Sequence, residues 1–80
     1  MDIREDIQPW IIDALRENGG NATITQVAKH VWEHHKEDIS KDEFALYNWQ
    51  YEMRWAAGKL RKTRQLKAAA ASTRGTWFLA

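Results

Sequence analysis

The densest group of residues with binding potential in this sequence is a run of cations close to its C-terminal end. Four basic residues fall within six positions and a fifth follows three residues later: Lys59, Arg61, Lys62, Arg64 and Lys67. Cations at a helix end are favourable by roughly 0.3–1 kcal/mol each, but a group of four without an acidic neighbour repels itself when no partner is bound. We therefore expect several of these side chains to contact phosphate groups.

The charge of the chain is divided between its two parts. Residues 54–80 hold seven Lys or Arg and no Asp or Glu, whereas residues 1–53 hold five basic and eleven acidic residues. The formal net charge of +1 thus conceals charges of about −6 and +7. A basic surface confined to one side is the electrostatic signature of proteins that dock on nucleic-acid backbones.

Polar residues between apolar positions form a second group of candidates. Lys41, Asn48, Gln50 and Arg54 lie between the apolar positions of an expected third helix. Asn and Gln side chains pair with adenine, and Arg pairs with guanine, in the major groove. Any amphipathic helix also exposes polar residues at such positions, so the residue types leave a purely solvated role open.

An expected loop near the end of the chain carries Ser72, Thr73 and Arg74. Small polar side chains suit contact with a phosphate backbone, and an arginine suits a narrow minor groove. A turn rich in small polar residues is also typical of any hairpin loop.

Two histidines, His30 and His34, are four residues apart, a spacing that can chelate a metal on one helix face. His35 and Glu33 lie alongside, but the sequence shows no further ligand elsewhere. We therefore predict a titrating surface cluster and no metal or other cofactor. Since no nucleophile–base set, phosphate loop or carboxylate pair can be discerned either, we expect a protein that is not an enzyme.

The composition predicts one small domain. Eighty residues with five Trp and no Cys suffice for a single core, and the absence of Cys suits a reducing compartment. The acidic start of the chain is unlike a signal peptide, and the sequence lacks the run of ~18 apolar residues that would indicate a membrane span. We expect a cytoplasmic protein, associated with the nucleoid if it is prokaryotic.

Apolar periodicity predicts two helices in the first half. The stripe Ile7, Trp10, Ile11 and Leu15 indicates a helix over about 4–18, which the Asn18–Asn21 segment with its two glycines ends. Residues 22–24 suggest a short strand, and a second helix over about 26–36 follows with Thr25 as its N-cap.

The third helix is expected over about 41–64, with Ser40 and Glu43 forming a capping box. Its buried stripe is Leu46, Trp49, Met53, Ala56 and Leu60. A second apolar set on a neighbouring face, comprising Phe44, Tyr47, Tyr51 and Trp55, predicts a helix packed on two sides. The pattern leaves open whether this helix is continuous or breaks near Asn48.

The aromatic residues are expected to serve the core rather than to stack on bases. Trp10, Trp32, Trp49 and Trp55 fall on apolar stripes, and Trp77 alternates on a strand. Tyr47, Tyr51 and Phe78 remain the candidates for partial exposure.

The chain closes with an expected β-hairpin over about 66–79. The fold class is therefore mainly α with a small β-hairpin (α+β), in the order helix, short strand, helix, helix, hairpin. This order is that of a winged helix-turn-helix, whose hairpin loop forms the wing.

Within that order, the segment 54–66 together with Arg74-Gly75-Thr76-Trp77 resembles the winged-helix domain that precedes the nuclease of Mrr-type restriction enzymes. The shared pattern is a Trp-Ala pair, a Leu with basic residues, and an Arg-Gly-x-Trp strand. The resemblance covers about a third of the chain and implies DNA binding without the nuclease. The family usually has Gly where this chain has Arg64-Gln65, so either a residue other than Gly accepts a left-handed backbone there or the helix ends differently.

The sequence thus predicts a small winged-helix protein that binds double-stranded DNA, as a transcriptional regulator or accessory factor. The third helix would enter the major groove, and the cations would hold phosphates. A homodimer is plausible, because single modules bury little surface on DNA. Two alternatives remain: a protein–protein interaction module that uses the same fold, favoured by the acidic first half, and sequence-independent binding by charge alone.

Overall fold

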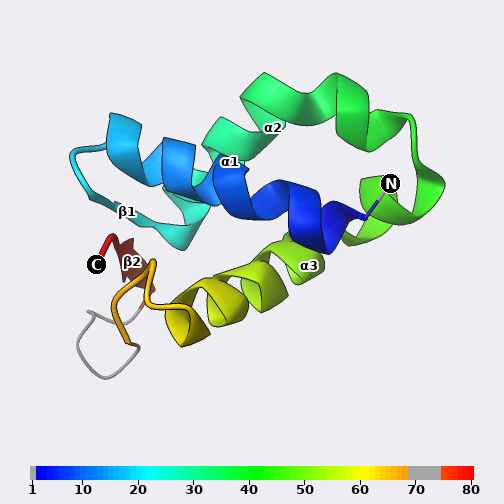
Figure 1. Ribbon diagram of the computed structural model, residues 1–80. Helices are drawn as coiled ribbons and strands as arrows, with labels where there is room; N and C mark the ends of the chain where they lie inside the picture. The colour runs from blue at the N-terminus through cyan, green and yellow to red at the C-terminus, as the bar shows by residue number, and fades with distance from the viewer. Residues whose placement is uncertain (1, 69–74) are drawn as a thin grey trace.

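The computed structural model describes residues 2–68 and 75–80 and contains three helices and two short strands in that part of the chain (Figure 1). The order is α1 (Ile3–Glu17), β1 (Asn21–Thr23), α2 (Ile24–Ser40), α3 (Glu43–Lys62) and β2 (Thr76–Phe78). The protein is therefore mainly helical with a small antiparallel sheet. In the described residues, no helix is long and apolar enough to cross a membrane.

The first helix matches its expected stripe and its expected end. Ile7, Ile11 and Leu15 are fully buried. After the C-cap residue Asn18, Gly19 and Gly20 have φ of 78° and 104°, and the Gly20 amide donates to the Leu15 carbonyl at 2.7 Å. This left-handed turn satisfies carbonyls that the helix leaves unpaired and directs the chain into β1.

The second helix is longer at both ends than expected. Its N-cap is Thr23 rather than Thr25, because the Thr23 hydroxyl accepts from the Gln26 amide while the Gln26 side chain accepts from the Thr23 amide. This capping box satisfies two donors at once. The helix continues through residues 37–39, expected as a connector, because Ile39 is fully buried and holds the last turn against the core.

The third helix is continuous across Asn48, but its predicted cap was wrong. Ser40 is the last residue of α2, and the N-cap is Asp42, whose carboxylate accepts from the Ala45 amide at 3.1 Å. This hydrogen bond lowers the pKa of Asp42, since it favours the ionised carboxylate. The helix ends at Lys62, two residues before its expected end.

One face of α3 carries the core, and the prediction that it packs on two sides was wrong. Trp49, Met53, Ala56 and Leu60 are buried. The second apolar set is exposed by 54–78% and comprises Phe44, Tyr47, Tyr51 and Trp55. Since α1 and α2 both pack on the same side of α3, those positions remain outside (Figure 1). Trp32, also expected in the core, is 37% exposed.

The small sheet joins the segment between α1 and α2 to the C-terminal end of the chain. β2 pairs with β1 in antiparallel register, Ala22 opposite Trp77, rather than forming the sheet by a C-terminal hairpin alone. Of the expected hairpin, the described residues show a single bridge between Leu66 and Leu79. Leu66 and Trp77 are buried, so the chain after α3 is fixed to the core at both points.

Candidate nucleic-acid interface

The interface candidates begin at the end of α3, where the chain turns through Arg64. The Gln65 amide donates to the Leu60 carbonyl at 2.9 Å and the Arg64 amide donates to the Arg61 carbonyl at 3.1 Å. Arg64 has φ 64°, the left-handed conformation that this cap requires and that a glycine adopts without strain. The expectation that a residue other than glycine takes this conformation is confirmed.

Four cations surround this turn, and we call them the basic end: Arg61, Lys62, Arg64 and Lys67. All are exposed except Arg61, which is half-buried. The Arg61 guanidinium lies 6.0 Å from the Trp77 ring centroid, and the Lys67 ammonium lies 5.9 Å from the Phe78 ring. Because both rings belong to β2, the small sheet helps to position the basic end beside α3.

The basic end carries uncompensated charge. In residues 2–68 and 75–80, none of its four side chains forms an ion pair with a carboxylate. Its cations therefore remain available to a phosphate backbone, which is the physical requirement for counterion release on binding.

Lys59 behaves differently from its neighbours. Its ammonium donates to the Glu5 carboxylate of α1 at 2.7 Å, with each side chain about half exposed. The sequence grouped Lys59 with the other cations, but the structure directs it toward α1. A phosphate would have to compete with Glu5 for this charge.

Gln50 and Arg54 are the exposed polar residues of α3 that lie nearest to α2. They line a groove of about 520 Å³ between the two helices, together with Ile24, Thr25, Ala28, Lys29, Trp32, Trp49 and Met53. Its floor is largely apolar and its rim is polar or basic. A base edge or an apolar side chain of a partner therefore finds both contact area and hydrogen-bond donors there.

Two other predicted residues are less well placed. The Asn48 side chain donates to the Phe44 carbonyl at 2.9 Å, within its own helix. Lys41 lines a depression with Asp6, Trp10, Asp38 and Asp42 at the α2–α3 turn, far from the basic end (Figure 1). Three carboxylates around Lys41 make this surface unfavourable for phosphate.

The predictions for Ser72, Thr73 and Arg74 lie outside the described residues. Nothing in the described part of the chain tests a contact at that loop.

The outward face of α3 carries a row of four exposed aromatic residues, of which Trp55 was expected in the core, whereas Tyr47 and Tyr51 were candidates for partial exposure. We call it the aromatic stripe: Phe44, Tyr47, Tyr51 and Trp55. Trp55 meets Tyr51 edge to face, at 6.4 Å between ring centroids, and lies under the Arg4 guanidinium at 5.0 Å. A helical turn of 3.6 residues places this stripe beside Arg54 and opposite Trp49. The angular positions of these residues around the helix axis would therefore have indicated that the stripe faces away from the core.

Arg4 is held over the stripe by the one charged side chain that α3 buries in the described residues. Glu52 is 5% exposed and accepts a hydrogen bond from Arg4, and this bond raises the pKa of Arg4. The pairing compensates the charge of the Glu52 carboxylate, and Glu43, in the first turn, is the other carboxylate on α3.

Comparison with protein-family models, with curated proteins and with solved structures finds no match. The interface must therefore be judged by its own geometry.

Proposed function

We propose that this chain is a winged-helix DNA-binding protein that acts by binding double-stranded DNA, as a transcriptional regulator or accessory factor. The observation that carries the proposal is the basic end, four cations that form no ion pair within residues 2–68 and 75–80 and surround a turn with a left-handed arginine. Backbone strain of this kind persists where the surrounding structure holds it, and it gathers at functional sites.

The proposed mode of binding follows from where the side chains lie. The outward face of α3 would enter the major groove, with Gln50 and Arg54 reaching base edges. The hydroxyl groups of Tyr47 and Tyr51 on the same face can donate to phosphate oxygens. The basic end would hold the phosphates that flank the groove.

The distribution of acidic residues supports this arrangement. Glu5 and Glu52 are paired with cations, and Asp6, Asp38 and Asp42 gather at the opposite end of α3. These five acidic residues therefore do not surround the basic end. A protein-interaction module could tolerate acidic residues there, whereas a phosphate-binding surface could not.

The test is fluorescence anisotropy of a random-sequence DNA duplex titrated with the protein at several salt concentrations. Neutralising several phosphates predicts a log–log slope of about −3 to −6. The triple variant Lys62→Gln/Arg64→Gln/Lys67→Gln should reduce the slope by about 3, since each lost phosphate contact removes about one.

The control is Lys36→Gln, which removes one positive charge and is therefore matched to the single variant Lys62→Gln. Lys36→Gln acts on the exposed face of α2, near the end of that helix that lies away from the basic end (Figure 1). Its slope should equal that of the unaltered protein. Absence of binding at about 50 mM salt would overturn the proposal, as would equal effects of the triple variant and the control.

The aromatic stripe favours a second candidate, a protein-interaction module. Aromatic side chains dominate the energetics of protein interfaces, and those of this stripe are exposed by 54–78%. A homodimer through α3 would bury them. The double variant Tyr47→Ala/Tyr51→Ala should then abolish concentration-dependent self-association in sedimentation equilibrium. If instead the protein is monomeric and this variant weakens only DNA binding, the stripe belongs to the DNA interface.

A further inference from the structure

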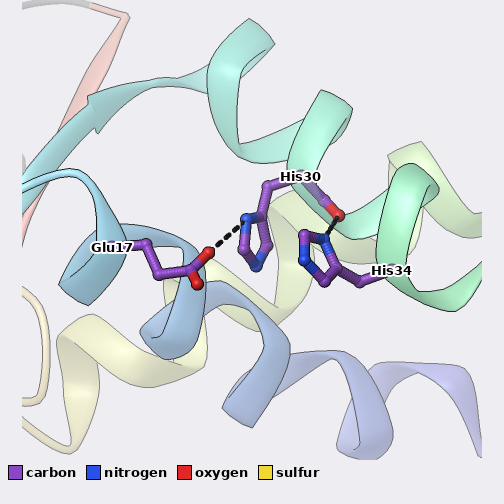
Figure 2. Close-up of side chains that lie close together, drawn as sticks. All are labelled: Glu17, His30 and His34. Carbon is purple, nitrogen blue, oxygen red and sulfur yellow. Dashed lines mark hydrogen bonds and ion pairs between the residues drawn. The ribbon is translucent and has the colours of Figure 1, made fainter.

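A side-chain cluster between α1 and α2 brings together three metal-binding groups from two helices. Glu17 lies in the last turn of α1, while His30 and His34 lie one turn apart on α2 (Figure 2). One ligand atom from each side chain can be chosen so that all three lie within 4.8 Å of one another. The sequence showed only the histidine pair, because Glu17 is brought to it by the packing of α1 against α2.

Hydrogen bonds orient both imidazoles for a metal. His34 Nδ1 lies 2.9 Å from the His30 carbonyl oxygen, which can only accept, so this nitrogen carries the proton in the neutral ring. His30 Nδ1 lies 3.0 Å from a Glu17 carboxylate oxygen, which has the same consequence. Both rings therefore present an unprotonated Nε2. The His30 carbonyl behind the His34 ring is the outer arrangement found around metal-bound histidines. Glu17 Oε2 is the oxygen next to His30 Nδ1, so Oε1 is the Glu17 oxygen left for an ion.

The mobility of the three side chains is suited to closing on an ion. The His30 side chain is 12% exposed and anchored, whereas the Glu17 side chain is 63% exposed and His34 is exposed. The rings of His30 and His34 stack at 4.0 Å. Zn–N distances of about 2.0–2.1 Å require the outer ring to rotate out of this stack, and its exposure leaves room for that movement.

The charge around the cluster also suits a cation. Asp13, Arg16 and His35 line the same depression as the three ligands, so two carboxylates face one guanidinium.

We propose that Glu17, His30 and His34 form a binding site for a divalent transition-metal ion of the zinc class. Two imidazole nitrogens and a carboxylate oxygen are ligands that zinc accepts, and three protein ligands leave a position for water. The site joins the end of α1 to the middle of α2, so metal binding should stabilise the fold. It is separate from α3, and it stands whether or not the chain binds DNA.

The experiment is isothermal titration calorimetry of Zn²⁺ into untagged, chelator-treated protein, with Co²⁺ absorption as a second measurement. One equivalent should bind, and visible Co²⁺ bands should indicate coordination by nitrogen. Thermal unfolding with Zn²⁺ should shift upward and return on addition of EDTA, since binding to the folded state alone raises its stability.

The variants Glu17→Gln and His34→Gln remove exposed ligands without touching the core, and each should weaken binding by about 10–100-fold. Glu33→Gln and Glu37→Gln are the matched controls, since both alter exposed carboxylates of α2 outside the depression, and they should bind Zn²⁺ within about twofold of the unaltered protein. No binding at 100 μM Zn²⁺, or equal binding by the ligand variants and the controls, overturns the proposal. Circular dichroism of each variant confirms that loss of binding is not loss of fold.

Discussion

The Lys59 ammonium donates to the Glu5 carboxylate at 2.7 Å, which removes one cation from the surface that the sequence marked as basic. The four cations of the basic end differ in having no such carboxylate partner among the described residues. The pair therefore divides the cationic run into a structural member, which ties α3 to α1, and the basic end.

This division predicts that Glu5→Gln strengthens DNA binding. The substitution releases Lys59, so affinity at low salt should rise several-fold and the salt slope should steepen by about one. Fluorescence anisotropy with the same duplex measures both. The double variant Glu5→Gln/Lys59→Gln should return to the unaltered slope, because no cation is gained. Glu5→Gln should lower the free energy of unfolding by less than about 1 kcal/mol, as expected for the loss of an exposed ion pair.

Arg64 supplies a second prediction in which stability and binding change in opposite directions. Arg64→Gly relieves the left-handed strain, so the protein should be stabilised by about 1 kcal/mol and its melting temperature should rise by about 4–8 °C. The same change removes a cation of the basic end and should flatten the salt slope by about one. Calorimetry and anisotropy on one preparation measure the two effects.

A purely structural role for Arg64 would give the first effect without the second. Arg64→Gln separates the two, because it removes the charge and keeps the left-handed strain. That variant should flatten the salt slope by about one and leave the melting temperature close to that of the unaltered protein.

The sequence predicted the elements well where one local signal dominates. The Ile7–Ile11–Leu15 stripe and the glycine pair after Asn18 define α1, because periodicity and left-handed turns are properties of the chain itself. The left-handed Arg64 was also foreseen. The resemblance that prompted it, to the winged-helix domain of Mrr-type enzymes, stays a prediction.

Errors arose where tertiary packing chooses between equivalent local signals. Thr23 and Thr25 both qualify as N-caps, as do Ser40 and Asp42, and only the position of Ile39 in the core extends α2 as far as Ser40. The aromatic stripe was placed inside because apolar type does not say which side of a helix its neighbours cover. The approach of Glu17 to His30 depends on how two helices cross, which no local pattern encodes.

The capping box of α2 gives a third prediction. Thr23→Ala removes the hydroxyl that accepts from the Gln26 amide at 3.1 Å, and it should destabilise the protein by about 1 kcal/mol. Thr25→Ala is the matched control at the position that the sequence favoured. Because Thr25 is exposed and lies inside the helix, its loss should change stability by less than about 0.5 kcal/mol. Urea unfolding followed by circular dichroism measures both, and equal effects would contradict the assigned cap.

His35 gives a fourth prediction, for the dependence of stability on pH. Its ring stacks on Trp10 at 3.9 Å, and burial there lowers the pKa of His35, although Asp38 and Asp13 oppose the effect while His34 and His30 add to it. The unfolded chain, with a histidine pKa near ~6.5, then binds a proton more readily than the folded protein. The stabilisation is complete above that pH and is lost as the pH falls through the lower folded value.

The urea midpoint should therefore decrease between about pH 7 and pH 5, a range that lies above the titration of most carboxylates. His35→Gln should reduce this decrease, whereas Lys36→Gln should leave it unchanged. A midpoint that rises on acidification over the same range would show that protonated His35 is favoured by the fold, contrary to the stacking on Trp10.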